Sequence, residues 1–348
     1  MKLKRIFGLD LVRAIAILLV VIVHVFMMNY FQISTIKGTS SFILLFIKNI
    51  AMTCVPLFIL LTGYLKYNKK LNKDHYKSII KILITYFIIA IITVLFDIFY
   101  LNNNFNINKH ILGIFNFTIN PYSWYIEMYI GLFLLIPFLN LIYHNLKQKK
   151  HKQLLIIILL FLSSIPYTIN NIKILNTNID ILPMYWSGLY IITFYYIGMY
   201  IREYQPKIKK SINILLIIGI TLIQTICIYL LVYNKTIEGN IILDYNSIFT
   251  YIISILIFIL FYDIKTDKKI IKKPIEIISN TTLELYLLSY IFDKLIYDYT
   301  NRGIININSN CFKSLITNVP TVFILSLISG IIIKYIIYLI EKSVKTYK

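Results

Sequence analysis

Two ionisable residues, Arg13 and His24, lie in an apolar segment near the N-terminus. An ionisable group in the middle of a membrane costs roughly 3 kcal/mol on insertion scales, so each needs a partner or a function. The two residues are eleven positions apart. At 3.6 residues per turn they return to nearly the same helix face, about 16 Å apart along the axis. Asp10, three residues before Arg13, shares this face and can pair with its guanidinium.

These residue types support anion binding and acid–base chemistry. A guanidinium suits bidentate binding of phosphate, and an imidazole can act as a general base near neutral pH. Arg13 is therefore a candidate phosphate-binding residue, Asp10 a candidate substrate-binding residue and His24 a candidate general base. The alternative is structural: Asp10 and Arg13 form an ion pair that only stabilises the fold, and His24 makes an interhelical hydrogen bond.

The chain that must position these residues has the composition of a membrane protein. Of its 348 residues, 58% are hydrophobic and only 14% are charged, far less charge than a soluble domain of this size would expose. A transmembrane helix needs about 20 mainly apolar residues to cross a core of about 30 Å. We expect a single all-α membrane domain over residues 1–348, a bundle of about ten transmembrane helices. The ten stretches are 9–31, 42–65, 79–101, 124–143, 153–170, 184–201, 212–233, 246–263, 275–297 and 319–340.

The basic residues indicate how this bundle is oriented. The net charge is +20, but Lys and Arg gather between the apolar stretches. This pattern is typical of topology signals and of contacts with anionic lipid in the bilayer, so we expect no nucleic-acid partner. With the N-terminus inside, the inner segments hold 25 of the 35 basic residues and the outer loops hold 8. The alternation predicts an N-in, C-in topology.

The fourth stretch brings further polar groups to the depth of His24 once this topology is imposed. It enters from outside through Trp124 and Tyr125, and Glu127 follows. A carboxylate within reach of an imidazole can orient it and stabilise its protonated form. Glu127 is therefore the candidate catalytic partner of His24. Trp124 and Tyr125 are candidate substrate-binding residues, and the alternative for both is an interfacial aromatic belt.

Motifs of soluble enzymes are missing from the sequence. The three cysteines, Cys54, Cys227 and Cys311, lack the spacing of metal ligands. No His, Cys, Asp or Glu cluster has metal-binding spacing either. There is no phosphate-binding loop, dinucleotide-binding motif or serine-hydrolase elbow. We expect no metal and no permanently bound cofactor.

Four segments, in order along the chain, resemble the membrane-bound acyltransferase-3 family. Residues 9–24 are similar to the start of that family, which is marked by an Arg and a His separated by ten residues in the first helix. Residues 55–65 and 123–137 are similar to its segments in the second and fourth helices. Residues 278–288 resemble a late segment in which a His is common, but this chain has Ser289 there. Ser289 is a candidate substrate-binding residue, and the departure from the family pattern puts in doubt any role that the His carries.

The resemblance implies transfer of an acyl group, often acetyl, from a cytoplasmic acyl-CoA to a hydroxyl or amine of an acceptor. Acceptors in the family include cell-envelope glycans and polysaccharides. On this interpretation acyl-CoA is a co-substrate bound at Arg13 and Tyr64, and His24 acts as the base. We expect a multi-pass protein of a bacterial plasma membrane that acts alone or with a separate acyl-accepting or glycosyltransferase partner.

Two functions of other classes remain open at this point. A stripe of Arg, His and Glu side chains can serve as a proton relay, as in a transporter or flippase for an amino acid or a polysaccharide precursor. The protein can also be a structural subunit of a machine that builds an envelope polymer. Proton-coupled uptake without acyl-CoA would favour transport, whereas CoA release stimulated by an acceptor would favour acyl transfer.

Overall fold

The computed structural model describes residues 5–102, 106–165, 167–168, 183–237, 244–301 and 306–346. These residues form helices joined by short segments, with one isolated β-bridge between Ile36 and Tyr233. The α-helices are α1 (Phe7–Met28), α2 (Gly38–Ala51), α3 (Cys54–Lys66), α4 (Lys73–Lys77), α5 (Ile80–Phe99), α6 (Ile107–Phe115), α7 (Trp124–Asn145), α8 (Lys149–Ser163), α10 (Tyr190–Tyr204), α11 (Lys210–Leu231), α12 (Ile248–Phe261), α13 (Lys269–Asn280), α14 (Thr282–Thr300) and α15 (Ile307–Thr346). Three short 3₁₀ helices are η1 (Phe31–Ile33), η2 (Pro121–Ser123) and η3 (Met184–Leu189).

The all-helical class and the membrane character are confirmed. Within the described ranges, six helical segments are long and apolar enough to cross a membrane. They are Phe7–Met28, Gly38–Lys66, Lys73–Phe99, Pro121–Asn145, Lys210–Leu231 and Ile307–Lys342. Each of the ten predicted stretches contains helical residues, but the shorter helices do not establish ten crossings. The count of ten and the N-in, C-in orientation stay predictions.

Two predicted stretches are each divided into two helices. The stretch 42–65 divides between α2 and α3, four residues before Pro56. A proline ring clashes with the carbonyl four residues earlier, so Pro56 favours a break there and is tolerated in the first turn of α3. The stretch 275–297 begins within α13 and continues in α14. α13 is strongly amphipathic with several lysines, which favours a position at the end of the bundle.

α7 continues past an internal proline because another part of the chain satisfies the freed backbone. Pro137 has no N–H to offer the carbonyl of Phe133, four residues earlier. His75, at the start of the α4–α5 segment, donates from Nε2 to that carbonyl at 2.9 Å. Its ring also stacks on the Phe133 ring, with centroids 4.1 Å apart. A buried imidazole therefore lets α7 remain one helix across the proline.

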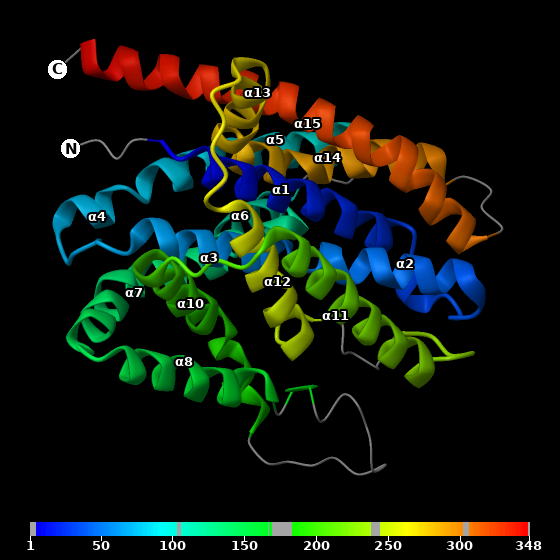
Figure 1. The fold of residues 1–348 in the computed structure, drawn as a ribbon. Coiled ribbons are helices and arrows are strands. Elements are labelled where there is room, and N and C mark those ends of the chain that lie inside the picture. Colours follow the sequence, from blue (N-terminus) through cyan, green and yellow to red (C-terminus); the bar gives the residue numbers. More distant parts are fainter. Residues whose placement is uncertain are drawn as a thin grey trace.

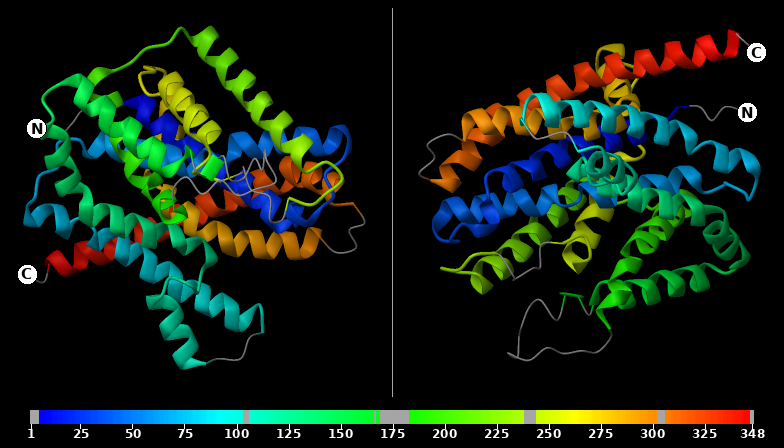
Figure 2. Two further views of the ribbon diagram at one scale, coloured as in Figure 1. Left: turned by 90° about the horizontal axis from the view of Figure 1, so that it is seen from below. Right: turned by 180° about the vertical axis from the view of Figure 1, so that it is seen from behind.

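α1 lies in the middle of the bundle, in contact with α2, α3, α12, α13, α14 and α15. The described ends of the chain lie at the same end of the bundle, together with α4 (Figure 1). α8 lies at the edge of the bundle in Figure 1 and in the right view of Figure 2, and α11 at the edge in the left view of Figure 2. Any side chain that points from α1 into the bundle is therefore surrounded by other helices.

α3 and α10 approach closely through a reciprocal pair of glycines. A Cβ at Gly63 would collide with the carbonyl oxygen of Tyr195, and one at Gly198 with the carbonyl oxygen of Leu60. Small residues allow membrane helices to pack backbone against backbone in this way. This contact fixes the position of α3, which carries Tyr64 and part of the wall of the central cavity.

We expect Gly198→Ala to destabilise the protein by about 1–3 kcal/mol, the usual effect of overpacking a tight interior. Thermal unfolding in detergent would show this as a lower midpoint. Gly219→Ala is the matched control, because a Cβ at Gly219 on α11 meets nothing within 4 Å. Equal midpoints for the two variants would contradict the close approach of α3 and α10.

Candidate functional site

One end of the site, near the N-terminus of α1, is an ion-pair network around Asp10. The buried Asp10 carboxylate lies 3.9 Å from Arg13 Nη1, which confirms the pairing predicted from the sequence. Arg5 also binds this carboxylate, through Nε at 2.5 Å and Nη2 at 3.0 Å. Ser279 on α13 donates to Asp10 Oδ1 at 2.6 Å and accepts from Arg13 Nη1 at 2.9 Å. Asp10 thus holds two guanidinium groups in place and has little capacity left for a substrate.

A pocket of about 300 Å³ opens beside this network. Arg5, Arg13 and Arg202 line it, so two guanidinium groups from the N-terminal segment and one from α10 share one space. Tyr64 also lines the pocket, accepts a hydrogen bond from Arg202 Nη1 at 3.3 Å and lies under its guanidinium. Guanidinium groups gathered in one pocket favour an anionic ligand, above all one with phosphate groups.

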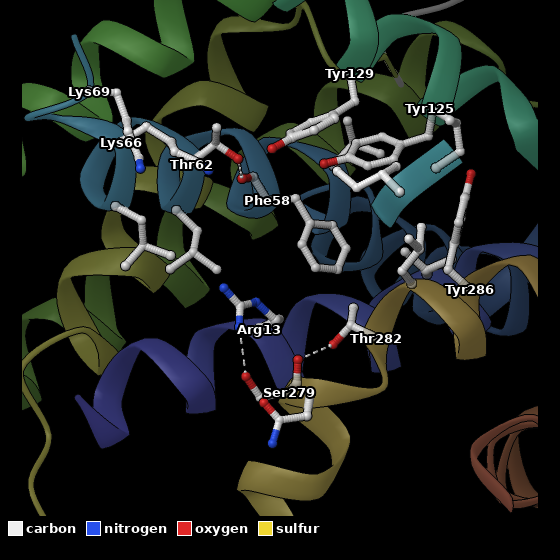
Figure 3. A pocket seen from close by; sticks show the side chains of 18 residues that line it. Arg13, Phe58, Thr62, Lys66, Lys69, Tyr125, Tyr129, Ser279, Thr282 and Tyr286 are labelled. Atoms are coloured by element: carbon white, nitrogen blue, oxygen red, sulfur yellow. Dashed lines mark hydrogen bonds between the residues drawn. The ribbon is translucent and has the colours of Figure 1, made fainter. Parts of the chain in front are cut away.

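A central cavity of about 470 Å³ continues from Arg13 into the bundle. Lys66 and Lys69 lie at one end, and Tyr125 and Tyr286 lie at the other, with Arg13 pointing into the space between the helices (Figure 3). The remaining walls are mostly apolar: Val20, Val55, Phe58, Leu61, Ile82 and Leu283. An apolar space with cations at one end fits a ligand with a charged head and a slender, weakly polar arm.

His24 lies buried near the other end of α1, with 5% of its surface exposed. Its Nδ1 is 2.9 Å from Oδ2 of Asp293 on α14, and the Asp293 side chain is fully buried. Tyr122 donates its hydroxyl to the same Oδ2 at 2.7 Å and stacks on the imidazole, with ring centroids 3.8 Å apart. Since a carboxylate only accepts, the proton lies on Nδ1 and the lone pair on Nε2. This is the arrangement of an oriented general base.

The carboxylate that holds His24 is not the one expected from the sequence. Glu127 is exposed on α7, one residue after the buried Ile126 and so about 100° around the helix. Asp293 was missed, although it is an acidic residue inside the ninth predicted stretch, towards the end that should share the depth of His24. This position was a signal for Asp293, but nothing in the sequence shows that α1 and α14 are neighbours.

The other predicted site residues have different surroundings. Tyr125 lines the central cavity, as a substrate-binding role requires. Trp124 is 37% exposed and stacks on Tyr245, with centroids 5.9 Å apart. Ser289 is fully buried and donates to the backbone carbonyl of Tyr286 at 2.7 Å, so its hydroxyl is already engaged.

The cavity ends one helical turn before His24. Val20 lines the cavity and His24 follows four residues later on the same face of α1. Tyr286 also lines it and donates to the backbone carbonyl of Tyr122 at 2.5 Å, while the Tyr122 ring covers the imidazole. Tyr286 therefore links the wall of the cavity to the tyrosine that stacks on the candidate base.

Comparison with known protein families identifies the family of the chain. A family model described as an acyltransferase domain matches residues 6–339, nearly the whole chain. The protein is thus a membrane acyltransferase. It belongs to the acyltransferase-3 family, as the four similar segments in the sequence predicted. No curated protein and no solved structure matches the chain.

Proposed function

We propose that the protein transfers an acyl group from a cytoplasmic acyl-CoA to a hydroxyl group of a cell-envelope glycan, polysaccharide or related acceptor. The observation that carries this proposal is the arrangement along α1. A cluster of guanidinium groups lies at one end, an oriented His24–Asp293 pair lies towards the other, and a largely apolar cavity occupies most of the distance between them.

The donor end is proposed to bind the phosphate groups of CoA. Arg5, Arg13 and Arg202 offer fork-shaped donors to phosphate oxygens, with Tyr64 packed against Arg202. Lys66 and Lys69 add positive charge where this pocket meets the cavity. The pantetheine arm then extends along the apolar walls, which exclude water from the thioester. In this proposal Asp10 positions Arg13 and Arg5 instead of binding the substrate itself.

The chemical step is proposed to use His24 as the general base. Nε2 takes the proton of the acceptor hydroxyl while its oxygen attacks the thioester carbonyl. The C–S bond then breaks, and the CoA sulfur leaves with the proton returned from the imidazole. Asp293 keeps the Nδ1 proton in place and stabilises the imidazolium that forms between the two transfers. In this proposal the acceptor reaches Nε2 past the end of the cavity, where Tyr286 forms part of the wall and donates a hydrogen bond to the backbone carbonyl of Tyr122.

The acyl group is proposed to be acetyl, and the site of action a bacterial plasma membrane. Transfer across the bundle would place the acceptor on the outer side, where a separate acyl-accepting or glycosyltransferase partner can supply it.

A direct test uses the purified protein in liposomes with labelled acetyl-CoA and a candidate glycan. CoA release that depends on the acceptor supports the proposal. Proton-coupled uptake of a solute without acyl-CoA, and no CoA release, would identify a transporter instead.

Replacing Arg13 with alanine should raise KM for acyl-CoA roughly 10- to 150-fold, the equivalent of losing charge-assisted hydrogen bonds worth about 1.5–3 kcal/mol. kcat at saturating donor should change far less, because Arg13 lies far from the reacting atoms. Arg13→Lys should recover part of the affinity, since it keeps the charge but loses the fork. Lys150→Ala, an exposed basic residue of α8, is the control. An unchanged KM in folded Arg13→Ala would remove Arg13 from the donor site.

A further inference from the structure

A third hollow lies beside the acyl-transfer path, on the surface of the bundle between α5, α14 and α15. Its volume is about 370 Å³. Ile82 and Leu283 line both this groove and the central cavity, so they form the wall between the two. The four charged residues of the groove are Lys81, Glu284, Lys334 and Glu341. None of them has a part in the proposed reaction.

These four charges form two pairs of opposite sign. Lys81 on α5 lies 3.5 Å from Glu341 on α15, and Lys334 on α15 lies 4.0 Å from Glu284 on α14. The groove therefore presents two cations and two anions, with no net charge. A site for a purely anionic lipid would show an excess of Lys or Arg, which this groove lacks.

Glu284 is the residue that points to a ligand. Its side chain is only 7% exposed, yet Oε2 has no hydrogen-bond partner among the described residues. The Lys334 ammonium, its closest cation, also donates to the backbone carbonyl of Asn280. A buried carboxylate oxygen without a donor is costly. Glu284 lines the groove, so a hydrogen-bond donor bound there lies beside this carboxylate.

The surroundings of the groove favour contact with lipid. The side chains of α15 beside it are apolar and exposed, among them Tyr335, Ile336, Tyr338 and Leu339. The amphipathic α13, rich in lysine, ends next to it at Asn280, which lines the groove. Charged residues beside an exposed apolar helix face suit a lipid, whose headgroup would meet the charges while its tails lie along the apolar face.

We propose that this groove binds the headgroup of an amino-phospholipid of the phosphatidylethanolamine type. The primary ammonium donates hydrogen bonds to Glu284 and Glu341, and the phosphate accepts from Lys81 and Lys334. A quaternary ammonium has no N–H to donate, so phosphatidylcholine leaves Glu284 without a donor. Phosphatidylglycerol has no cation and places its charge near both carboxylates. The proposal does not depend on the acyl-transfer reaction.

The test is lipid binding to the full chain, measured by native mass spectrometry from detergent with equal amounts of the three lipids. We expect phosphatidylethanolamine to bind on the order of tenfold more tightly than the other two, the usual effect of one charge-assisted hydrogen bond. Glu284→Gln and Lys334→Ala should reduce this preference to within about twofold. Asp267→Asn, which removes an exposed acidic charge in the loop before α13, should retain it.

Lys81→Ala keeps the experiment decisive if Glu284→Gln does not fold, because the Lys81 side chain is 76% exposed and its removal leaves the interior intact. It should weaken binding of phosphatidylethanolamine and phosphatidylglycerol alike. Equal binding of all three lipids to the wild-type protein would overturn the proposal, as would an unchanged preference in folded Glu284→Gln. Competition by free phosphoethanolamine at the same concentration as the lipid would also overturn it, because the ligand would then be a soluble molecule.

Discussion

Replacing His24 with alanine is expected to lower kcat/KM for acyl transfer by about 10²–10⁴-fold, the usual contribution of a positioned general base. The effect should fall on kcat, because His24 lies beyond the cavity that we assign to the donor, while KM for acyl-CoA stays close to the wild-type value. The measurement is acceptor-dependent release of CoA by purified protein in liposomes.

Two further variants make this experiment specific. His24→Gln retains a side-chain amide that can donate to Asp293, so it should preserve the buried hydrogen bond while removing the base. Its activity should be as low as that of His24→Ala. His151→Ala removes an exposed imidazole from α8 and should leave activity unchanged. Wild-type activity in a folded His24→Ala protein would eliminate His24 as the base.

Replacing Asp293 with asparagine should lower kcat on the order of 10²–10⁴-fold, with little change in KM for acyl-CoA. In serine proteases the equivalent replacement of the orienting Asp leaves the geometry intact but selects the wrong tautomer of the His. Here the Asn amide can donate to Nδ1, which would move the imidazole proton to Nε2. The base would then have no lone pair facing the acceptor.

Glu127→Gln is the matched control, since both substitutions replace one carboxylate with an amide. Glu127 is exposed on α7, so its substitution should change kcat by less than about twofold. A purely structural role of Asp293 would lower stability and the active fraction, whereas a positioning role lowers kcat per folded molecule. Similar losses for Glu127→Gln and Asp293→Asn would reject the assignment of Asp293 as the partner of His24.

Features that depend on local periodicity were correctly predicted from the sequence. Asp10 and Arg13 are three residues apart on one helix, so their pairing follows from helix geometry alone. The helical class followed from the apolar stretches, and the acyltransferase-3 family from four short segments in order. The membership rests on nearly the whole chain, and so does not depend on any single residue of the site.

Features that depend on which helices are neighbours were predicted poorly. Glu127 and Asp293 were both carboxylates near the expected depth of His24, and the sequence offered no reason to prefer the one 269 residues away. The division of the stretch 42–65 near Pro56 is a different case, because it follows from a local effect of proline that the hydropathy pattern does not contain. The depth of a residue along its helix can be inferred from the residue count. The neighbours that its side chain meets around the helix axis depend on how the helices pack.

By itself, then, the sequence determined the membrane class, the family and the two polar positions on α1, because composition and spacing along one helix are properties of the chain. Only the tertiary structure decided that Asp293 holds His24 and that Arg5 and Ser279 complete the network around Asp10. The reason is physical. Buried polar groups in a membrane must find partners, and the choice of partner is made by the packing of helices that are distant in the chain.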